Sequence, residues 1–221
     1  MIRAFVAIAL PESVIMSLEA CQAGLPAGRA VAPENLHLTV AFLGEHPAPV
    51  IEDVHLALSG IRAPAFHLSL DGVGLFGGGR PRVLYAGIRR EPGLGHLRDK
   101  VLQAARSAGL NLPRERISPH VTLARFKNGL KGEQVDEMQA FVARRMPQAT
   151  GAFAVDEFIL FRSTLGRNGP AYEELAALSA GGRAVRLRPP VGGCQRPRGR
   201  SQNGRAASRA AVASSTPMSR S

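Results

Sequence analysis

Two short stretches, ENLHLTVAFLG at residues 34–44 and SPHVTLARF at residues 118–126, decide how this sequence folds. Each has a histidine followed two positions later by a threonine, inside a largely apolar run. Side chains alternate between the two faces of a β-strand, so residues two apart point to the same face. Each stretch therefore predicts a strand with an apolar face and a polar pair on the other face. The four polar residues are His37, Thr39, His120 and Thr122.

Similar elements surround both stretches. In the first half the pattern predicts strands at 2–10, 35–44 and 65–76 and helices at 11–24 and 48–60. In the second half it predicts strands at 82–88, 120–126 and 153–163 and helices at 93–109 and 132–146. Equivalent elements lie about 80 to 87 residues apart, and the two histidines are 83 apart. An internal duplication explains this order most simply, although repeated patterning also arises by chance in α+β chains.

The predicted fold class is therefore α+β and bilobal. Two strand-helix-strand-helix-strand units would form antiparallel sheets flanking a central cleft. We expect one domain over residues 1–180, with lobes of roughly 1–80 and 81–180. Copies of one unit generally pack about an approximate two-fold axis, so His37 and His120 would face each other across the cleft.

The net charge of +11 is concentrated at the C-terminal end. Residues 181–221 contain nine Arg and no Asp, Glu or Lys, whereas the preceding residues contain 19 basic and 17 acidic side chains. This C-terminal arm, residues 181–221, has few large apolar residues, so we expect it to be disordered. It either binds RNA phosphates or is a solvated extension. The nearly neutral body gives no indication of a long basic groove but is compatible with a local basic cluster.

Cysteine content and hydropathy indicate the compartment. Cys21 and Cys194 are the only cysteines, which makes a disulfide framework implausible and favours a reducing environment. The apolar run at 4–10 ends at Pro11 and suits a buried strand better than a signal peptide. No segment approaches the roughly 18 uninterrupted apolar residues of a membrane span. We expect a cytoplasmic protein without membrane contact.

Paired histidines suit acid and base catalysis near neutral pH. An imidazole has an unperturbed pKa of about 6.5, so a neutral histidine can accept a proton while a protonated one donates. In displacement at phosphorus the attacking and leaving oxygens lie roughly in line, which one histidine on each side would serve. The hydroxyls of Thr39 and Thr122 would donate to the non-bridging oxygens. A single such histidine is more often structural, but two at equivalent positions favour catalysis.

These residues resemble a known family. The paired H-x-T-x motifs, HLTV at 37–40 and HVTL at 120–123, are the signature of the two-histidine phosphoesterases. ENLHLTVAFLGE, RPRVLYAG, ISPHVTLAR and DEFILFRSTLGRNGPAYEEL, in this order and spacing, resemble the LigT-type RNA 2′,3′-cyclic phosphodiesterases of the 2′-5′ RNA ligase family. The resemblance covers residues 1 to about 175.

The resemblance implies a bilobal fold and hydrolysis of a 2′,3′-cyclic phosphate to a 2′-phosphate, without metal or cofactor. The substrate would be an RNA end or a small cyclic nucleotide, and no obligate protein partner is implied. His37 would donate a proton to the departing 3′ oxygen, and His120 would accept one from water. Arg125, five positions after His120, would contact phosphate. Simple alternation places Arg125 on the opposite face from His120, so a bulge or a strand end must bring it round.

Phe42 occupies the equivalent place after His37. It would stack on a base or, alternatively, be a core phenylalanine. FGGGRPR at 76–82 lacks the Lys and Ser or Thr of a phosphate-binding loop and predicts a hairpin connection. The other histidines lack metal-ligand spacing. After Tyr172 the sequence drifts into the arm, which puts the family's last strand in doubt.

Three alternatives for function stay open. The same site would serve 2′-5′ RNA ligation, or cleavage of a 2′-5′-linked oligonucleotide. A protein without catalytic activity would instead bind RNA through residues 181–221.

Overall fold

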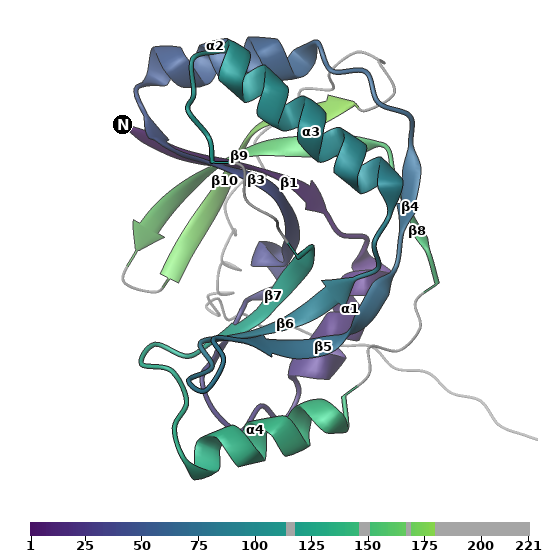
Figure 1. Cartoon of the computed structure of the whole chain (residues 1–221), viewed down its shortest axis with the longest axis vertical. Coiled ribbons are helices and arrows are strands. Elements are labelled where there is room, and N and C mark those ends of the chain that lie inside the picture. Colours follow the sequence, from purple (N-terminus) through teal and green to yellow (C-terminus); the bar gives the residue numbers. More distant parts are fainter. Residues whose placement is uncertain (114–117, 146–150, 167–168, 180–221) are drawn as a thin grey trace, which may run out of the picture. The chain divides into compact units, whose positions relative to one another are not determined.

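The computed structural model describes residues 1–113, 118–145, 151–166 and 169–179 (Figure 1). One large sheet contains β1 (Ile2–Ala9), β2 (Arg29–Ala30), β3 (His37–His46), β5 (Leu70–Phe76), β6 (Val83–Ile88), β7 (His120–Arg125), β9 (Glu157–Gly166) and β10 (Gly169–Ser179). A small sheet contains β4 (Phe66–Leu68) and β8 (Phe153–Val155). The helices are α1 (Glu12–Gln22), α2 (Ala48–Ser59), α3 (Pro92–Ser107) and α4 (Glu133–Ala143), with a 3-10 turn at Pro33–Asn35.

The strands of the large sheet run in the order β10-β9-β1-β3-β7-β6-β5, with β2 paired to β7. All strand pairs are antiparallel, which confirms the predicted α+β class. The order is symmetric about the junction of β3 and β7, because β1 flanks β3 as β6 flanks β7. A duplicated unit would give this order, and the division into two lobes stays a prediction.

Two predicted strands are wrong in the same way. The segments 65–76 and 153–163 each break into two strands that belong to different sheets: β4 pairs with β8, whereas β5 pairs with β6 and β9 with β1. The breaks fall at Ser69 and Asp156. Apolar alternation specifies which face of a strand is buried but not which strand it pairs with, so a change of partner leaves no trace in the pattern.

The end of the domain is better formed than the sequence indicates. β10 pairs with β9 from Gly169 to Ser179, with one register shift between Glu174 and Ala176. Ala176 and Leu178 belong to the hydrophobic core. The last strand therefore forms in spite of the drift after Tyr172. The expected disorder at 181–221 falls outside the described residues.

Three of the helices contact strands of the large sheet. α2 and α3 contact each other and strands β1, β3 and β10, while α1 contacts β7 (Figure 1). All four helices contribute buried residues to a single hydrophobic cluster. None of the described helices is long and apolar enough to span a membrane.

Strand β1 shows how the two faces of the sheet differ. Its residues 4 to 8 are all buried. Ala4, Val6 and Ile8 belong to the helix-covered cluster, whereas Phe5 and Ala7 lie outside it. The side of the sheet that carries Phe5 has no helix over it within the described ranges. We call this side the open face, and the residues of the candidate site lie on it.

Candidate active site

Strands β3 and β7 bring the two His-x-Thr pairs together. They are joined by one register pair, Leu38 with Val121, and both of these side chains are fully buried in the core. Directly opposed residues of an antiparallel pair share a face, and their neighbours along each strand point to the other one. The polar residues on either side of this pair therefore all lie on the open face: His37, Thr39, His120 and Thr122.

The same register sets the spacing of the histidines. Extending the register of Leu38 and Val121 by one residue each way sets Thr122 across from His37 and Thr39 across from His120, which makes the histidines diagonal neighbours. Diagonal residues of an antiparallel pair lie about 7–8 Å apart, which leaves room for a phosphate between two imidazoles. The charge of His120 acts on the pKa of His37, as expected for two groups at close range. His37 and His120 are both partly exposed.

Both imidazoles are held in the same way. Nδ1 of His37 lies 2.8 Å from the carbonyl oxygen of Asn35, and Nδ1 of His120 lies 2.8 Å from that of Ser118. A carbonyl oxygen only accepts a hydrogen bond, so Nδ1 carries the proton in each ring. Nε2 is then the atom that gains or loses a proton, as an acid or base requires.

A register shift brings Arg125 to the open face. Tyr85 pairs with Thr122, but the next residue of β6, Leu84, pairs with Ala124. β7 therefore holds one extra residue, and Leu123 and Ala124 are both buried. Arg125 pairs with Val83, which shares a face with Tyr85. Of the two predicted possibilities, a bulge or a strand end, the structure has a bulge, and Arg125 lies on the same face as the histidines.

Strand β3 contains a bulge of the same kind. Thr39 pairs with Ala7, whereas Ala41 pairs with Val6, so β3 also holds one extra residue. Phe42 then pairs with Phe5 on the open face, with ring centroids 6.0 Å apart. Phe42 is 64% exposed. The alternative of a core phenylalanine is therefore wrong, and stacking on a base stays a prediction.

Aromatic rings enclose His37. Phe5 lies 5.0 Å away between centroids, and Tyr172 stands edge-on at 5.1 Å. Burial among these rings lowers the pKa of His37, and the positive charges of Arg125 and His120 lower it further. The hydrogen bond to Asn35 acts in the opposite direction. In the free site His37 is therefore predominantly neutral near pH 7.

A second aromatic group supports His120. Phe76 meets the imidazole edge-on at 4.8 Å, and Tyr85 lies 5.7 Å away. Phe76 and Tyr85 stack on each other with centroids 3.9 Å apart. A Cβ atom on Gly74 would lie only 2.6 Å from the Tyr85 hydroxyl, so the glycine makes room for this ring.

Arginines add positive charge at the open face. Burial raises the pKa of Tyr172, and the charges of Arg125 and Arg3 partly oppose that shift, so both guanidinium groups lie near its hydroxyl. Arg29 pairs across strands with Arg125. A Cβ atom on Gly169 would lie 3.5 Å from Nη1 of Arg29, so this side chain reaches toward β10.

Sequence reasoning missed the aromatic shell and two arginines: Phe5, Phe76, Tyr85, Tyr172, Arg3 and Arg29. Tyr85 and Tyr172 lie inside the segments that carry the family resemblance, which is the one signal that could have drawn attention to them. No three His, Cys, Asp or Glu side chains in the described part of the chain gather as metal ligands. A surface hollow between α2 and α3, lined by Asp53, Leu56 and Ser107, contains none of the site residues.

Comparison with known proteins points to one family. The model of the 2′-5′ RNA ligase superfamily matches residues 10–167. An RNA 2′,3′-cyclic phosphodiesterase of Escherichia coli (strain K12) is 35% identical over 177 residues, covering 78% of this chain and 93% of the relative.

A protein of the same name from Geobacillus stearothermophilus is 34% identical over 156 residues, or 69% of this chain. The match spans 48% of that longer relative. Among solved structures, Escherichia coli LigT in its apo form superposes with a TM-score of 0.67 at 32% identity. This superposition covers 80% of this chain and 96% of LigT.

Proposed function

Because the chain belongs to the 2′-5′ RNA ligase superfamily, we propose that it is an RNA 2′,3′-cyclic phosphodiesterase. It would hydrolyse a 2′,3′-cyclic phosphate at an RNA end to a 2′-phosphomonoester. The observation that carries the proposal is the placement of both His-x-Thr pairs on one face of the sheet around Leu38 and Val121. Eight curated relatives carry this enzyme name, which supports the same reaction.

In the proposed reaction water attacks phosphorus and the bond to the 3′ oxygen breaks. His120 accepts the proton from water, and His37 donates a proton to the 3′ oxygen, which leaves as a hydroxyl. One proton is taken up and one released, so the pair exchanges protonation states in each turnover. On each side of the phosphorus the proton would be transferred by an Nε2 atom, because Nδ1 of each ring is hydrogen-bonded to a backbone carbonyl oxygen.

In this partly desolvated site the non-bridging phosphate oxygens need hydrogen-bond donors. The hydroxyls of Thr39 and Thr122 lie beside the histidines on the same face. Arg125 faces them after the register shift and offers a planar pair of N–H donors that suits phosphate. These three groups would hold the phosphate while the histidines move protons.

Substrate binding would also prepare His37. A proton donor must be protonated, yet the pKa of His37 is lowered in the free site. The anionic phosphate brings a negative charge next to the imidazole and offsets the charge of Arg125, and both effects raise the pKa of His37. The donor would thus become protonated only when the substrate is bound.

Phe42 would bind the terminal base. It is the one large apolar side chain on the open face of β3 that is mostly exposed, and Phe5 supports it from behind. A base stacked on an exposed aromatic ring gains about 1–3 kcal/mol without reading its identity. Recognition at this point would therefore tolerate any of the four bases.

The test is turnover of 2′,3′-cyclic UMP with excess chelator present. Continued release of 2′-UMP supports the proposal, and complete dependence on added metal contradicts it.

The reducing compartment predicted from two cysteines suits an RNA enzyme of the cytoplasm, and Cys21 is buried and unpaired.

Ligation is a second candidate because the matching family model is named for it. The same histidines would then activate a 5′-hydroxyl instead of water. Two RNA fragments, one ending in a 2′,3′-cyclic phosphate and one beginning with a 5′-hydroxyl, separate the two reactions by the ratio of joined to hydrolysed product.

A further inference from the structure

Two connections beside the site carry an uncompensated positive charge. The β5–β6 connection (residues 77–82) and the β7–α4 connection (residues 126–132) contain four basic residues and no acidic one. All four basic side chains are exposed. We call this group the basic rim: Arg80, Arg82, Lys127 and Lys131.

Hydrogen bonds tie the two connections into one surface. The amide of Phe126 donates to the carbonyl of Arg82 at 2.8 Å, and the amide of Leu130 donates to that of Pro81 at 2.8 Å. A Cβ atom on Gly129 would lie 2.7 Å from Cγ of Arg80, so the stem of Arg80 crosses the second connection. The four charges are therefore held together by the backbone.

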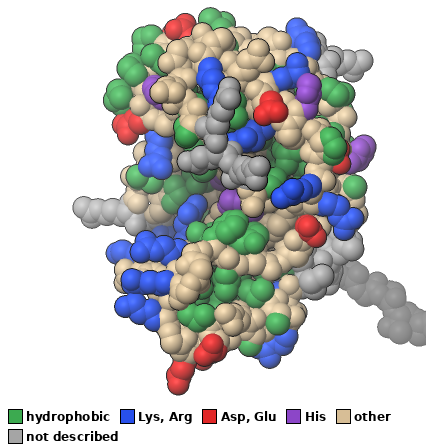
Figure 2. All heavy atoms as spheres, viewed as in Figure 1, with side chains coloured by type: hydrophobic (Ala, Val, Ile, Leu, Met, Phe, Trp, Pro, Cys, Tyr) green, Lys and Arg blue, Asp and Glu red, His purple; other side chains and the backbone are tan. Residues whose placement is uncertain are grey.

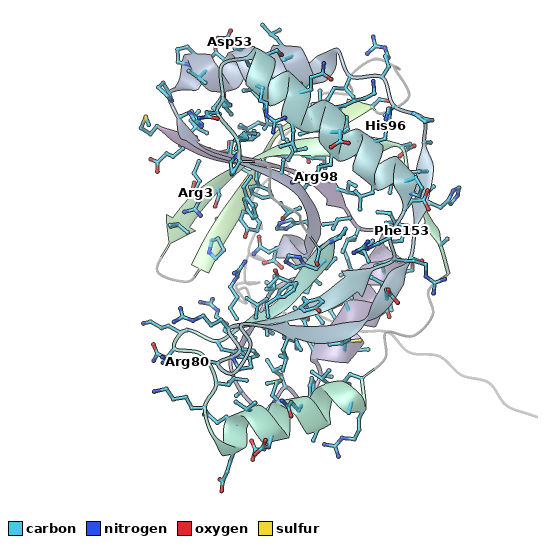
Figure 3. All side chains as sticks on the ribbon, viewed as in Figure 1. Arg3, Asp53, Arg80, His96, Arg98 and Phe153 are labelled. Carbon is cyan, nitrogen blue, oxygen red and sulfur yellow. The ribbon has the colours of Figure 1, made fainter. Side chains whose placement is uncertain are left out.

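The basic rim continues directly from the phosphate site. Arg125 is the last residue of β7, and its cross-strand partner Val83 is the first residue of β6. Arg82 of the rim directly precedes Val83, and Lys127 follows Arg125 by two residues. Figure 2 shows Lys and Arg side chains gathered on the side of the molecule where Figure 1 draws these connections, and Figure 3 labels Arg80 there.

The other half of the site differs in charge. Among its described residues, Nη1 of Arg162 lies 3.7 Å from Oε2 of Glu173. Glu45 and Glu174 are both exposed. Exposed apolar side chains also occur on these strands, at Phe42 and Leu165. The half that presents a stacking ring therefore mixes both signs of charge, whereas the basic rim has one sign only.

We propose that the basic rim binds the phosphates of the nucleotides upstream of the cyclic end, so that the preferred substrate is a single-stranded RNA of several nucleotides. This inference rests on the proposed function and narrows its substrate class. A cluster of exposed cations next to a site for the terminal phosphate suits an RNA backbone that continues from it, because neutralising phosphates releases counterions. An acidic protein segment is the competing partner.

The experiment compares 2′,3′-cyclic UMP with an eight-residue oligouridylate ending in a 2′,3′-cyclic phosphate, using the full chain. We expect kcat/KM to be roughly tenfold higher for the oligonucleotide at low salt, as several phosphate contacts would give. The variant Arg80→Gln/Lys127→Gln/Lys131→Gln should lose this advantage and keep the turnover of 2′,3′-cyclic UMP. Glutamine keeps the first two methylenes of each side chain, including the Cγ of residue 80 that lies over Gly129.

The matched control removes three exposed charges elsewhere: Arg62→Gln/Arg89→Gln/Arg90→Gln. Both variants retain residues 181–221, so any effect of that arm is common to them. The rim variant should reduce the slope of log affinity against log salt by about 2, since single strands give about 0.7 per charge. The control should leave the slope unchanged.

Binding is also measured without chemistry, as anisotropy of a fluorescein-labelled octauridylate ending in a 3′-hydroxyl. Weaker binding by the rim variant alone supports the inference. Equal binding by both variants, no length advantage in the wild type, or equally strong competition by polyglutamate overturns it. Loss of all turnover with rim-dependent binding intact would instead overturn the phosphodiesterase assignment and leave the rim as an RNA surface.

Discussion

Tyr172 stands edge-on to His37, with ring centroids 5.1 Å apart and an interplanar angle of 88°. Burial is the largest cause of the lowered pKa of His37, and this ring contributes to that burial. Tyr172→Ala should therefore raise the pKa of His37 toward its ordinary value, because water reaches the imidazole. NMR titration of the ring protons measures this shift directly.

Tyr172→Phe is the matched variant, since it keeps the ring and removes only the hydroxyl. We expect it to leave the pKa of His37 close to that of the wild type. An equal shift in both variants would mean that the hydroxyl, and not the ring, controls the imidazole.

Arg125→Gln should have two separate effects, one on the pKa of His37 and one on substrate binding. It removes a positive charge that lowers the pKa of His37, so this pKa rises in the free protein. It also removes a charged donor to phosphate, which should raise KM roughly 10- to 100-fold for a cyclic nucleotide. Arg89→Gln provides the control at the opposite end of β6, with neither effect expected. A weaker substrate affinity without a change in the pKa of His37 would place Arg125 away from the imidazole.

The pH dependence of the rate should differ between kcat/KM and kcat. If His37 is the donor, the rate falls as pH rises through its pKa, and kcat/KM reports the lowered value of the free site. The alkaline limb of kcat should lie at higher pH, because bound phosphate raises the same pKa. An alkaline limb that does not move would argue that His37 is the base.

Phe42→Ala should weaken substrate binding and leave the fold intact. The ring is 64% exposed, so the free energy of unfolding should change by less than about 0.5 kcal/mol. Loss of stacking should cost about 1–3 kcal/mol, seen as a higher KM for all four cyclic nucleotides. Leu165→Ala removes a side chain that is 69% exposed and should leave KM unchanged. A strongly destabilised Phe42→Ala protein would return this residue to the core.

Gly28 sets the approach of β2 to the site. Its φ is +89°, and a Cβ atom there would clash with the ring of Phe126. Gly109 has nearly the same φ, +88°, with no atom within 4 Å of its Cβ position. Gly109→Ala should cost about 1 kcal/mol of backbone strain, and Gly28→Ala clearly more because the clash is added. Denaturant unfolding compares the two, and equal losses would contradict the clash.

How much of this site the sequence predicts depends on the residue. Repetition and alternation are enough to place the two His-x-Thr pairs on strands. For Arg125, which the family resemblance adds, alternation requires either a bulge or a strand end, and the structure has a bulge. They do not show which strands pair, so the breaks at Ser69 and Asp156 are missed. The ring of Tyr172 reaches His37 from a strand 135 positions later in the chain. Such contacts depend on sheet order, which local patterning does not specify.

Loss of either histidine is the substitution closest to the chemistry. His37→Ala and His120→Ala should each reduce turnover about 100-fold or more, as removal of an acid or base does. His67→Ala is the control, because this exposed histidine lies on β4 in the small sheet. Circular dichroism should show all three variants folded.

The most direct measurement follows 2′,3′-cyclic UMP with the wild type and both histidine variants by phosphorus NMR, which resolves 2′- from 3′-UMP. Departure of the 3′ oxygen predicts 2′-UMP from the wild type, and two histidines working on opposite sides of one phosphorus predict almost no product from either variant. Undiminished turnover in a variant, or 3′-UMP as the main product, would contradict this account.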